Sequence, residues 1–190
     1  MYNLKIITST VRPGRKGVAV EEWITEYTKK HTDFNVELLD LSKINLPFMD
    51  EPHHPILKKY EHEHTKKWSA VIDEADAFIF VTGEYDYNYP APLRNAIEYL
   101  AHEWQYKAAG IVSYGGISAG TRASNSLKAY LATMKIVPLP EAVHLPFFAQ
   151  HINEEGKLTV NEITIKAADN MLKELLRWTK GLKIIRENKN

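Results

Sequence analysis

The 190-residue sequence contains no cysteine. This absence excludes disulfide bonds, a thiol nucleophile and a thiolate metal site, and it suits the reducing environment of the cytoplasm. Neither sign of charge is in excess, since 24 Lys and Arg residues are balanced by 24 Asp and Glu residues. A neutral chain has no general attraction for nucleic acid or for an anionic membrane surface. We therefore expect neither as a partner.

Long apolar runs are missing as well. No segment approaches the roughly 20 apolar residues that a helix needs to cross a bilayer. The apolar stretch within residues 1–8 is too short for a secretory signal, and the sequence has no repeat, linker or low-complexity segment. With 44% hydrophobic and 25% charged residues, the composition predicts one soluble, cytoplasmic domain over residues 1–190.

Strand-like and helix-like apolar patterns alternate along the chain. The segments typical of strands are 4–8, 34–41, 77–81, 108–113 and one within 136–145. Helical spacing of apolar residues follows each of them. These helices are expected from about residue 18, from Ile56 to near Ala75, from Ala91 to Trp104, from about residue 121, and from about Asn161 with a frayed end after Gly181.

This alternation predicts an α/β fold with a doubly wound parallel sheet. Residues 77–81 have no polar face, which is typical of a strand that is covered on both sides. Right-handed crossovers then place helices on both faces of the sheet. Ligands of such sheets bind beyond the carboxyl ends of the strands. The loops 10–17, 83–90 and 114–120 are expected to share that edge.

The most informative of these loops follows the first predicted strand and leads directly into a helix. The free N–H groups and the dipole at a helix start attract phosphate. Thr10 adds a hydroxyl donor, and Gly17 lets backbone approach a ligand closely. The cations of this loop are Arg12, Arg15 and Lys16. The loop therefore predicts a phosphate site, with a solvated basic loop as the alternative.

The other two loops suit a flat, partly polar ring. Residues 83–90 contain three tyrosines among hydrogen-bonding side chains, which could stack on a heteroaromatic ring and address its edge. Tyr114-Gly115-Gly116 could lie flat beneath a ring. The alternatives are a loop that packs on itself or on a second subunit, and a simple strand-to-helix turn. Together the three loops favour a mononucleotide with a tricyclic base, and flavin mononucleotide (FMN) is the economical choice.

Three ordered motifs resemble the NAD(P)H-dependent FMN reductases, a flavodoxin-like family that includes quinone and azo reductases. The first motif is Ser9-Thr10-Val11-Arg12-Pro13-Gly14-Arg15. The second is residues 83–90 followed by Leu93-Arg94-Asn95-Ala96. The third is Lys107, then Val112-Ser113-Tyr114-Gly115-Gly116 and Gly120-Thr121-Arg122-Ala123. The resemblance implies the strand order 2-1-3-4-5, hydride transfer from NADPH or NADH through bound FMN to a flavin, quinone or similar small acceptor, and a homodimer or a dimer of dimers.

The resemblance also assigns roles to residues. In the family the first motif holds the FMN phosphate and the second contacts the isoalloxazine ring. With the cations and the glycine turn added, the predicted FMN site consists of Thr10, Arg12, Arg15, Lys16, Gly17, Val18, Glu84, Tyr85, Asp86, Tyr87, Asn88, Ser113, Tyr114, Gly115 and Gly116. No protein acid or base is needed, because the flavin carries the hydride, and no metal ligand is expected.

Four positions depart from the family pattern. Ser9 replaces the glycine of the family motif, Gly83 replaces proline, Asp86 replaces asparagine and Asn88 replaces serine. A carboxylate at Asp86 would disfavour an anionic reduced flavin unless it is paired or turned to solvent. The alternative function is therefore a non-enzymatic electron carrier or a degenerate FMN-binding module, although flavodoxins are usually acidic and this chain is neutral.

Two further groups of residues are given structural interpretations. His62 and His64 fall on nearly opposite faces of a helix, so the histidine-rich region that also holds His53 and His54 is interpreted as a surface or subunit contact and not as a metal site. The aromatic pair at 147–148 is interpreted as core or interface.

Overall fold

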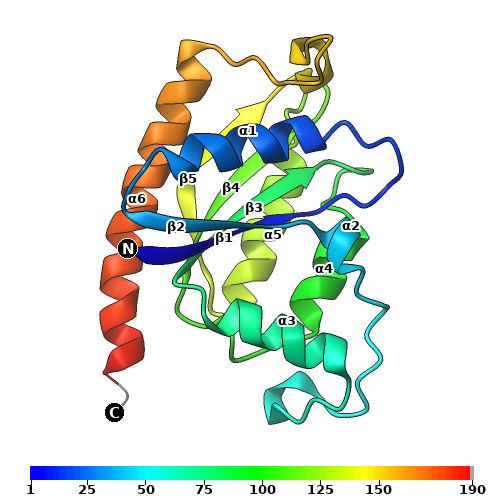
Figure 1. Ribbon diagram of the computed structural model, residues 1–190, viewed down its shortest axis with the longest axis vertical. Helices are drawn as coiled ribbons and strands as arrows, with labels where there is room; N and C mark the ends of the chain where they lie inside the picture. Colours follow the sequence, from blue (N-terminus) through cyan, green and yellow to red (C-terminus); the bar gives the residue numbers. More distant parts are fainter. Residues whose placement is uncertain (189–190) are drawn as a thin grey trace.

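The computed structural model describes residues 1–188, and its centre is a sheet of five parallel strands (Figure 1). The strands are β1 (Tyr2–Thr8), β2 (Phe34–Leu39), β3 (Ala77–Gly83), β4 (Ala108–Tyr114) and β5 (Val137–Leu145). Their order in the sheet is β2-β1-β3-β4-β5. The predicted doubly wound order 2-1-3-4-5 is confirmed.

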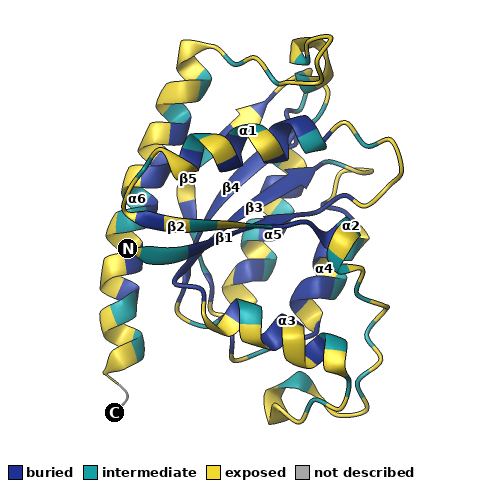
Figure 2. Cartoon of the chain, viewed as in Figure 1, coloured by how far each residue is buried: buried dark blue, intermediate teal, exposed yellow. Residues whose placement is uncertain are grey.

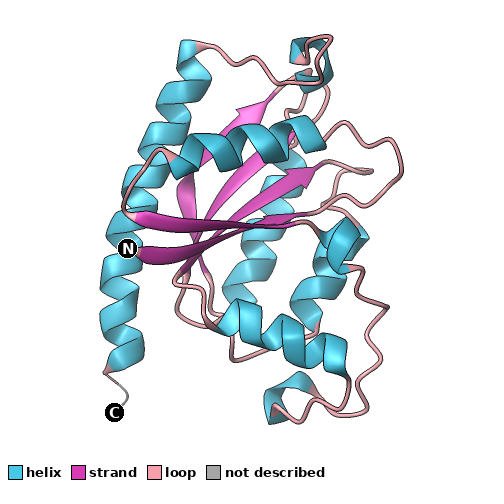
Figure 3. Ribbon diagram, in the orientation of Figure 1, coloured by secondary structure: helices cyan, strands magenta, loops and turns pink. Residues whose placement is uncertain are grey.

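Helices cover both faces of this sheet (Figure 3). They are α1 (Val18–Lys29), α2 (Leu41–Ile44), α3 (Glu63–Asp73), α4 (Ala91–Glu98), α5 (Thr121–Thr133) and α6 (Glu162–Glu187), with 3₁₀ turns η1 (Pro55–Leu57) and η2 (Phe148–His151). The apolar faces of α1 and α6 pack in one core cluster, and those of α3, α4 and α5 pack in the other. All residues of β3 and β4 are buried between the two layers (Figure 2).

The helix predicted to end at Trp104 ends earlier, at Glu98. The indole of Trp104 donates to the carbonyl of Ile97 at 3.1 Å, which is a carbonyl that the next helical turn would otherwise use. Trp104 itself is fully buried against Phe78. The helix predicted from Ile56 is also divided, because Ile56 lies in the separate, exposed turn η1.

The final helix does not fray after Gly181, contrary to expectation, and α6 continues to Glu187. Leu182 is buried in the core. The guanidinium of Arg186 donates to Asp76 Oδ1 at 2.9 Å and to the carbonyl of Tyr106 at 2.8 Å. These contacts hold the last turns of α6 against the end of the sheet remote from the predicted ligand edge.

The segment between β2 and α3 follows an extended course along the edge of the molecule (Figure 1). The carboxylate of Asp50 accepts a hydrogen bond from the Tyr99 hydroxyl at 3.0 Å and lies 3.0 Å from Nε2 of His64. The rings of His62 and His64 are stacked, contrary to the expectation that they lie on nearly opposite faces of a helix, because His62 has extended backbone and precedes the first turn of α3. Within residues 1–188 no helix combines the length and the apolar character needed to cross a bilayer.

Candidate cofactor-binding site

The three loops that follow β1, β3 and β4 meet around one cleft of about 500 Å³. A volume of this size is typical of small-molecule sites. The residues that line it are Thr10, Arg12, Gly14, Arg15, Lys16, Gly17, Gly83, Glu84, Tyr85, Tyr114, Gly115, Phe148 and Ala149. Nine of the predicted site residues are therefore brought together at the carboxyl edge of the sheet.

A fourth segment that sequence reasoning missed closes one side of the cleft. Phe148 and Ala149 of η2 line it together with the three loops. The ring of Phe148 lies 4.6 Å from the ring of Tyr114, centroid to centroid. The sequence signal, an aromatic pair after the fifth strand, is present, but the interpretation as core or interface did not place it at this edge.

The first loop has the donor arrangement expected of a phosphate site. No hydrogen bond in the described part of the chain uses the N–H groups of Lys16, Gly17 or Val18. They stand at the N-terminus of α1, where the helix dipole favours negative charge. Thr10 is buried, and its hydroxyl lies at the end of β1 beside the same cleft. Backbone donors without partners and a buried hydroxyl thus lie in the loop that lines one end of the cleft.

The side chain of Tyr114 fills the space beneath this loop. It is 5% exposed, and its hydroxyl oxygen lies 3.2 Å from Oγ1 of Thr10. A Cβ on Gly17 would overlap that hydroxyl and lie 2.7 Å from Cζ of the ring, and a Cβ on Gly83 would come within 3.1 Å of the ring. Tyr114 therefore connects loops that follow three different strands.

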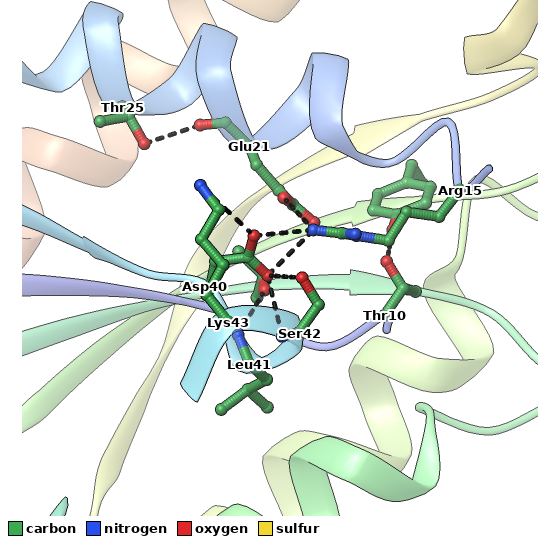
Figure 4. A network of polar contacts seen from close by, with 10 residues as sticks. Thr10, Arg15, Glu21, Thr25, Asp40, Leu41, Ser42 and Lys43 are labelled. Carbon is green, nitrogen blue, oxygen red and sulfur yellow. Dashed lines mark hydrogen bonds and ion pairs between the residues drawn. The ribbon is translucent and has the colours of Figure 1, made fainter. Parts of the chain in front are cut away.

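The Arg15 side chain is paired with the carboxylate of Asp40 (Figure 4). Its Nη2 donates to both carboxylate oxygens of Asp40, at 2.8 and 2.9 Å, and lies 3.7 Å from Glu21. Asp40 also accepts from the N–H of Ser42 and caps α2. Arg15 thus ties the first loop to the end of β2, while no ion pair within residues 1–188 involves Arg12 or Lys16.

Glu21 lies near Arg15 of the first loop, and its carboxylate lacks part of its hydrogen bonding. The residue is 2% exposed, and in the described chain its Oε1 accepts no hydrogen bond. Burial raises the pKa of Glu21 to about 7, against the opposing effect of Arg15. Glu21 therefore changes its protonation near neutral pH at a position adjacent to the candidate phosphate site.

Replacing Glu21 by Gln should remove a pH dependence of stability. Because the folded-state pKa of Glu21 is raised, its contribution to the free energy of unfolding is complete below about pH 4.5 and is lost as the pH rises through 7. The loss amounts to about 3 kcal/mol. Urea unfolding at pH 5 and pH 8 measures this, and we expect a steeper loss in the wild type than in Glu21→Gln. Equal losses in the two proteins would contradict this interpretation.

The loop after β3 forms a tight hairpin. The backbones of Tyr85 and Asn88 exchange two hydrogen bonds of 2.9 Å, and Asp86 and Tyr87 between them have φ of 47° and 69°. Two central residues with positive φ are typical of a type I′ turn, in which Asp is well tolerated. Asp86 is exposed at this turn, so its carboxylate can remain in water instead of facing the cleft.

An ion pair attaches this hairpin to the start of α5. Glu84 Oε1 accepts from Nε of Arg122 at 2.6 Å, and Glu84 Oε2 accepts from the Ser118 hydroxyl at 3.0 Å. The guanidinium of Arg122 also stacks on Tyr87, 3.7 Å from the ring centre. The resemblance assigns Glu84 to the ring of the cofactor. In the structure Glu84 lines the cleft, and its carboxylate also holds the hairpin against Arg122 and Ser118.

The remaining predicted residues do not line the cleft. Asp86, Tyr87 and Asn88 lie at the tip of the hairpin, Val18 is in α1, and Gly116 follows the cleft-lining Gly115. Ser113 is buried and points elsewhere, because its hydroxyl donates to the carbonyl of Ala119 at 2.8 Å and lies 2.7 Å from Nδ1 of His144.

Comparison with known proteins shows the family of this chain. Residues 3–150 match the family model described as NADPH-dependent FMN reductase. The chain belongs to this family. Like the reductases of this family, it is an FMN-dependent oxidoreductase that uses NAD(P)H. The resemblance found in the sequence motifs is thereby confirmed, and the comparisons give no support to a non-enzymatic function.

Named relatives of this FMN reductase come from fungi and plants. The chain is 41% identical over 145 residues to an NAD(P)H-dependent FMN reductase of Schizosaccharomyces pombe, covering 74% of this chain and 72% of that protein. It is 31% identical over 106 residues to an NAD(P)H:quinone oxidoreductase of Solanum tuberosum, covering 51% of this chain and 50% of that protein.

A solved structure shares the fold. The flavoenzyme NAD(P)H:(acceptor) oxidoreductase FerB of Paracoccus denitrificans superposes with a TM-score of 0.75 at 20% sequence identity, covering 95% of this chain and 98% of that one. At this identity the likeness concerns the architecture, and it agrees with the flavodoxin-like sheet order described above.

Proposed function

We propose that the cleft binds FMN with the phosphate at the loop of residues 10–18 and the isoalloxazine ring toward Gly83–Tyr85 and Gly115. The observation that carries this proposal is that the N–H groups of Lys16, Gly17 and Val18 at the start of α1 have no hydrogen-bond partner in the described chain, in a loop whose Thr10 also lines the cleft. The donor set fits a phosphate, and the aromatic and glycine-rich walls fit a flat ring.

In this proposal the side chains around the cleft hold the cofactor in position and balance the charge of its phosphate. Arg12 and Lys16 supply positive charge for the phosphate dianion, and Arg15 holds their loop through Asp40. Tyr85 lines the cleft at its ring end. FMN, when bound, supplies the hydride-accepting and electron-passing chemistry, so that no side chain is assigned as an acid or base.

The electron acceptor proposed is a flavin, a quinone or a similar small molecule, and the hydride donor is NADPH or NADH. The names of the relatives, which include FMN reductases and quinone oxidoreductases, support this range. The test is the visible spectrum of the purified protein with added FMN, followed by NADPH oxidation with FMN or a benzoquinone. We expect tight FMN binding and turnover. A protein that binds no FMN would refute the proposal.

Replacing Arg122 by Ala should weaken the ring end of the site. The change removes the cation paired with Glu84 and stacked on Tyr87, so the hairpin loses its ion pair to α5 and keeps only the hydrogen bond from Ser118. We expect the dissociation constants of FMN and riboflavin to rise together, each on the order of 10-fold. Fluorescence titration with both flavins measures this.

Arg94 offers a matched control for this change. It pairs with Glu98 at 2.8 Å and stacks on Tyr130 at 4.8 Å, which reproduces the same chemistry outside the cleft. Arg94→Ala should leave both affinities unchanged. An Arg122→Ala protein with wild-type affinity for both flavins would show that the ion pair does not support the ring site.

We also propose that the protein is a cytoplasmic homodimer or a dimer of dimers. Large apolar side chains between β2 and α3 support an interface, since Phe48 is 85% exposed, Ile56 58% and Leu57 55%. The hydride donors NADH and NADPH are intracellular metabolites, which supports the location. Light scattering at micromolar concentration tests the assembly, and a monomer would contradict it. Cell fractionation tests the location.

A further inference from the structure

The hydroxyl groups of Tyr114 and Thr10 form an isolated buried pair beside the candidate phosphate site. Their oxygens are 3.2 Å apart, and both residues are at most 5% exposed. In the described chain, Thr10 is the only hydrogen-bond partner of the Tyr114 hydroxyl. Gly17 lies directly against this pair, because a Cβ on it would come 3.2 Å from Oγ1 of Thr10 and would overlap the hydroxyl of Tyr114.

The direction of this hydrogen bond determines what Thr10 can offer a ligand. Each hydroxyl has one proton, and a phosphate dianion can only accept. If Thr10 donated to Tyr114, the lone pairs of Thr10 would be left facing the phosphate. If Tyr114 donates to Thr10, the proton of Thr10 is free for the phosphate. Only the second arrangement is favourable with an anion present.

The surroundings of Tyr114 support the second arrangement. Burial raises the pKa of the Tyr114 phenol above its usual range, so the group keeps its proton at neutral pH. A phenol is also a stronger donor than an aliphatic alcohol. The ring is held against Phe148 and against the backbone of Gly83 and Gly17, which fixes the hydroxyl at Thr10.

We propose that Tyr114 is a positioning residue for phosphate recognition, whose hydroxyl donates to Thr10 so that Thr10 donates to the FMN phosphate. This inference rests on the proposed function, in which the phosphate lies at the loop of residues 10–18. It makes Tyr114 a determinant of the preference for FMN over riboflavin, although Tyr114 is not itself assigned a contact with the phosphate.

The test compares the affinities of FMN and riboflavin by fluorescence titration. Tyr114→Phe keeps the ring and removes the hydroxyl, so the FMN dissociation constant should rise about 10-fold while that of riboflavin changes by less than about 2-fold. Thr10→Val should reduce the preference for FMN at least as much. Adding Tyr114→Phe to Thr10→Val should reduce it no further, because the relay is already broken.

A buried tyrosine elsewhere provides the control. The hydroxyl of Tyr99 donates to Asp50 at 3.0 Å, away from the cleft, so Tyr99→Phe should leave both flavin affinities unchanged. If Tyr114→Phe weakens both flavins equally, or leaves the FMN preference intact, the inference is overturned. If Tyr114→Phe does not fold, a Thr10→Val protein that keeps the full preference for FMN over riboflavin would overturn it as well. If the wild type binds no FMN, the proposed function itself fails.

Discussion

Gly17→Ala is expected to abolish tight FMN binding while leaving the protein folded. The added Cβ would overlap the Tyr114 hydroxyl and lie 2.7 Å from Cζ of its ring. Phe148 and the backbone of Gly83 lie against the ring, so the ring can retreat only toward the cleft. Either the ring then occupies the space of the cofactor, or the loop moves and its N–H groups move with it. We expect the FMN dissociation constant to rise about 100-fold, equivalent to about 3 kcal/mol of overpacking.

Gly181→Ala is the matched control for this change. Gly181 lies within α6, and a Cβ on it would meet nothing within 4 Å. The control should bind FMN as the wild type does and gain up to about 1 kcal/mol of stability from helix propensity. Circular dichroism establishes that both variants are folded, and flavin fluorescence gives the affinities. A folded Gly17→Ala protein with wild-type affinity would remove the first loop from the site.

Arg15→Ala is expected to lower the free energy of unfolding by about 3 kcal/mol. The Arg15 and Asp40 side chains are only 14% and 9% exposed, and Nη2 of Arg15 donates to both oxygens of Asp40. Removing the guanidinium leaves the Asp40 carboxylate desolvated, with Ser42 and the exposed Lys43 as its remaining partners. The first loop also loses its attachment to the end of β2. Urea unfolding at pH 7 measures the change.

Arg177→Ala provides the comparison for the loss of an exposed arginine. Its side chain is 81% exposed and lies 3.7 Å from Glu174 within α6. Its removal should cost less than about 0.5 kcal/mol. If Arg15→Ala were equally mild, the guanidinium of Arg15 would not be structural, and its assignment as a direct phosphate ligand would be favoured.

The sheet was predictable because its signals are local. The uninterrupted apolar run at 77–81 predicted a central buried strand, and alternation with helices predicted parallel connections. The strand order came from the family resemblance. The helix ends were less predictable, because they depend on tertiary contacts. Trp104 meets Ile97 only after the chain has folded back, and Arg186 reaches Asp76 across 110 residues of sequence.

In the candidate site, too, the features set by adjacent residues were predictable and those set by distant contacts were not. The strand-to-helix junction and Gly17 predicted a phosphate cradle from adjacent residues, and the free N–H groups lie there. The Arg15 side chain binds Asp40, and the Glu84 carboxylate binds Arg122, which lies 38 residues later in the sequence. What each side chain does therefore depends on a residue that is distant in the sequence. Charge and spacing show that Arg15 can bind an anion and that Glu84 can accept hydrogen bonds from a ligand, but they do not show which partner within the protein is closer. Phe148 also lines the cleft through contacts with residues that are distant in the sequence, among them Tyr114.

The position of the FMN phosphate can be tested most directly by nuclear magnetic resonance of the ¹⁵N-labelled protein. Backbone amide shifts would be followed during titration with FMN and, separately, with riboflavin. We predict that the amides of Lys16, Gly17 and Val18 shift strongly with FMN and little with riboflavin, while Tyr85 and Gly115 respond to both. Saturating FMN with no response at Lys16 to Val18 would contradict the assignment of the first loop as the phosphate site.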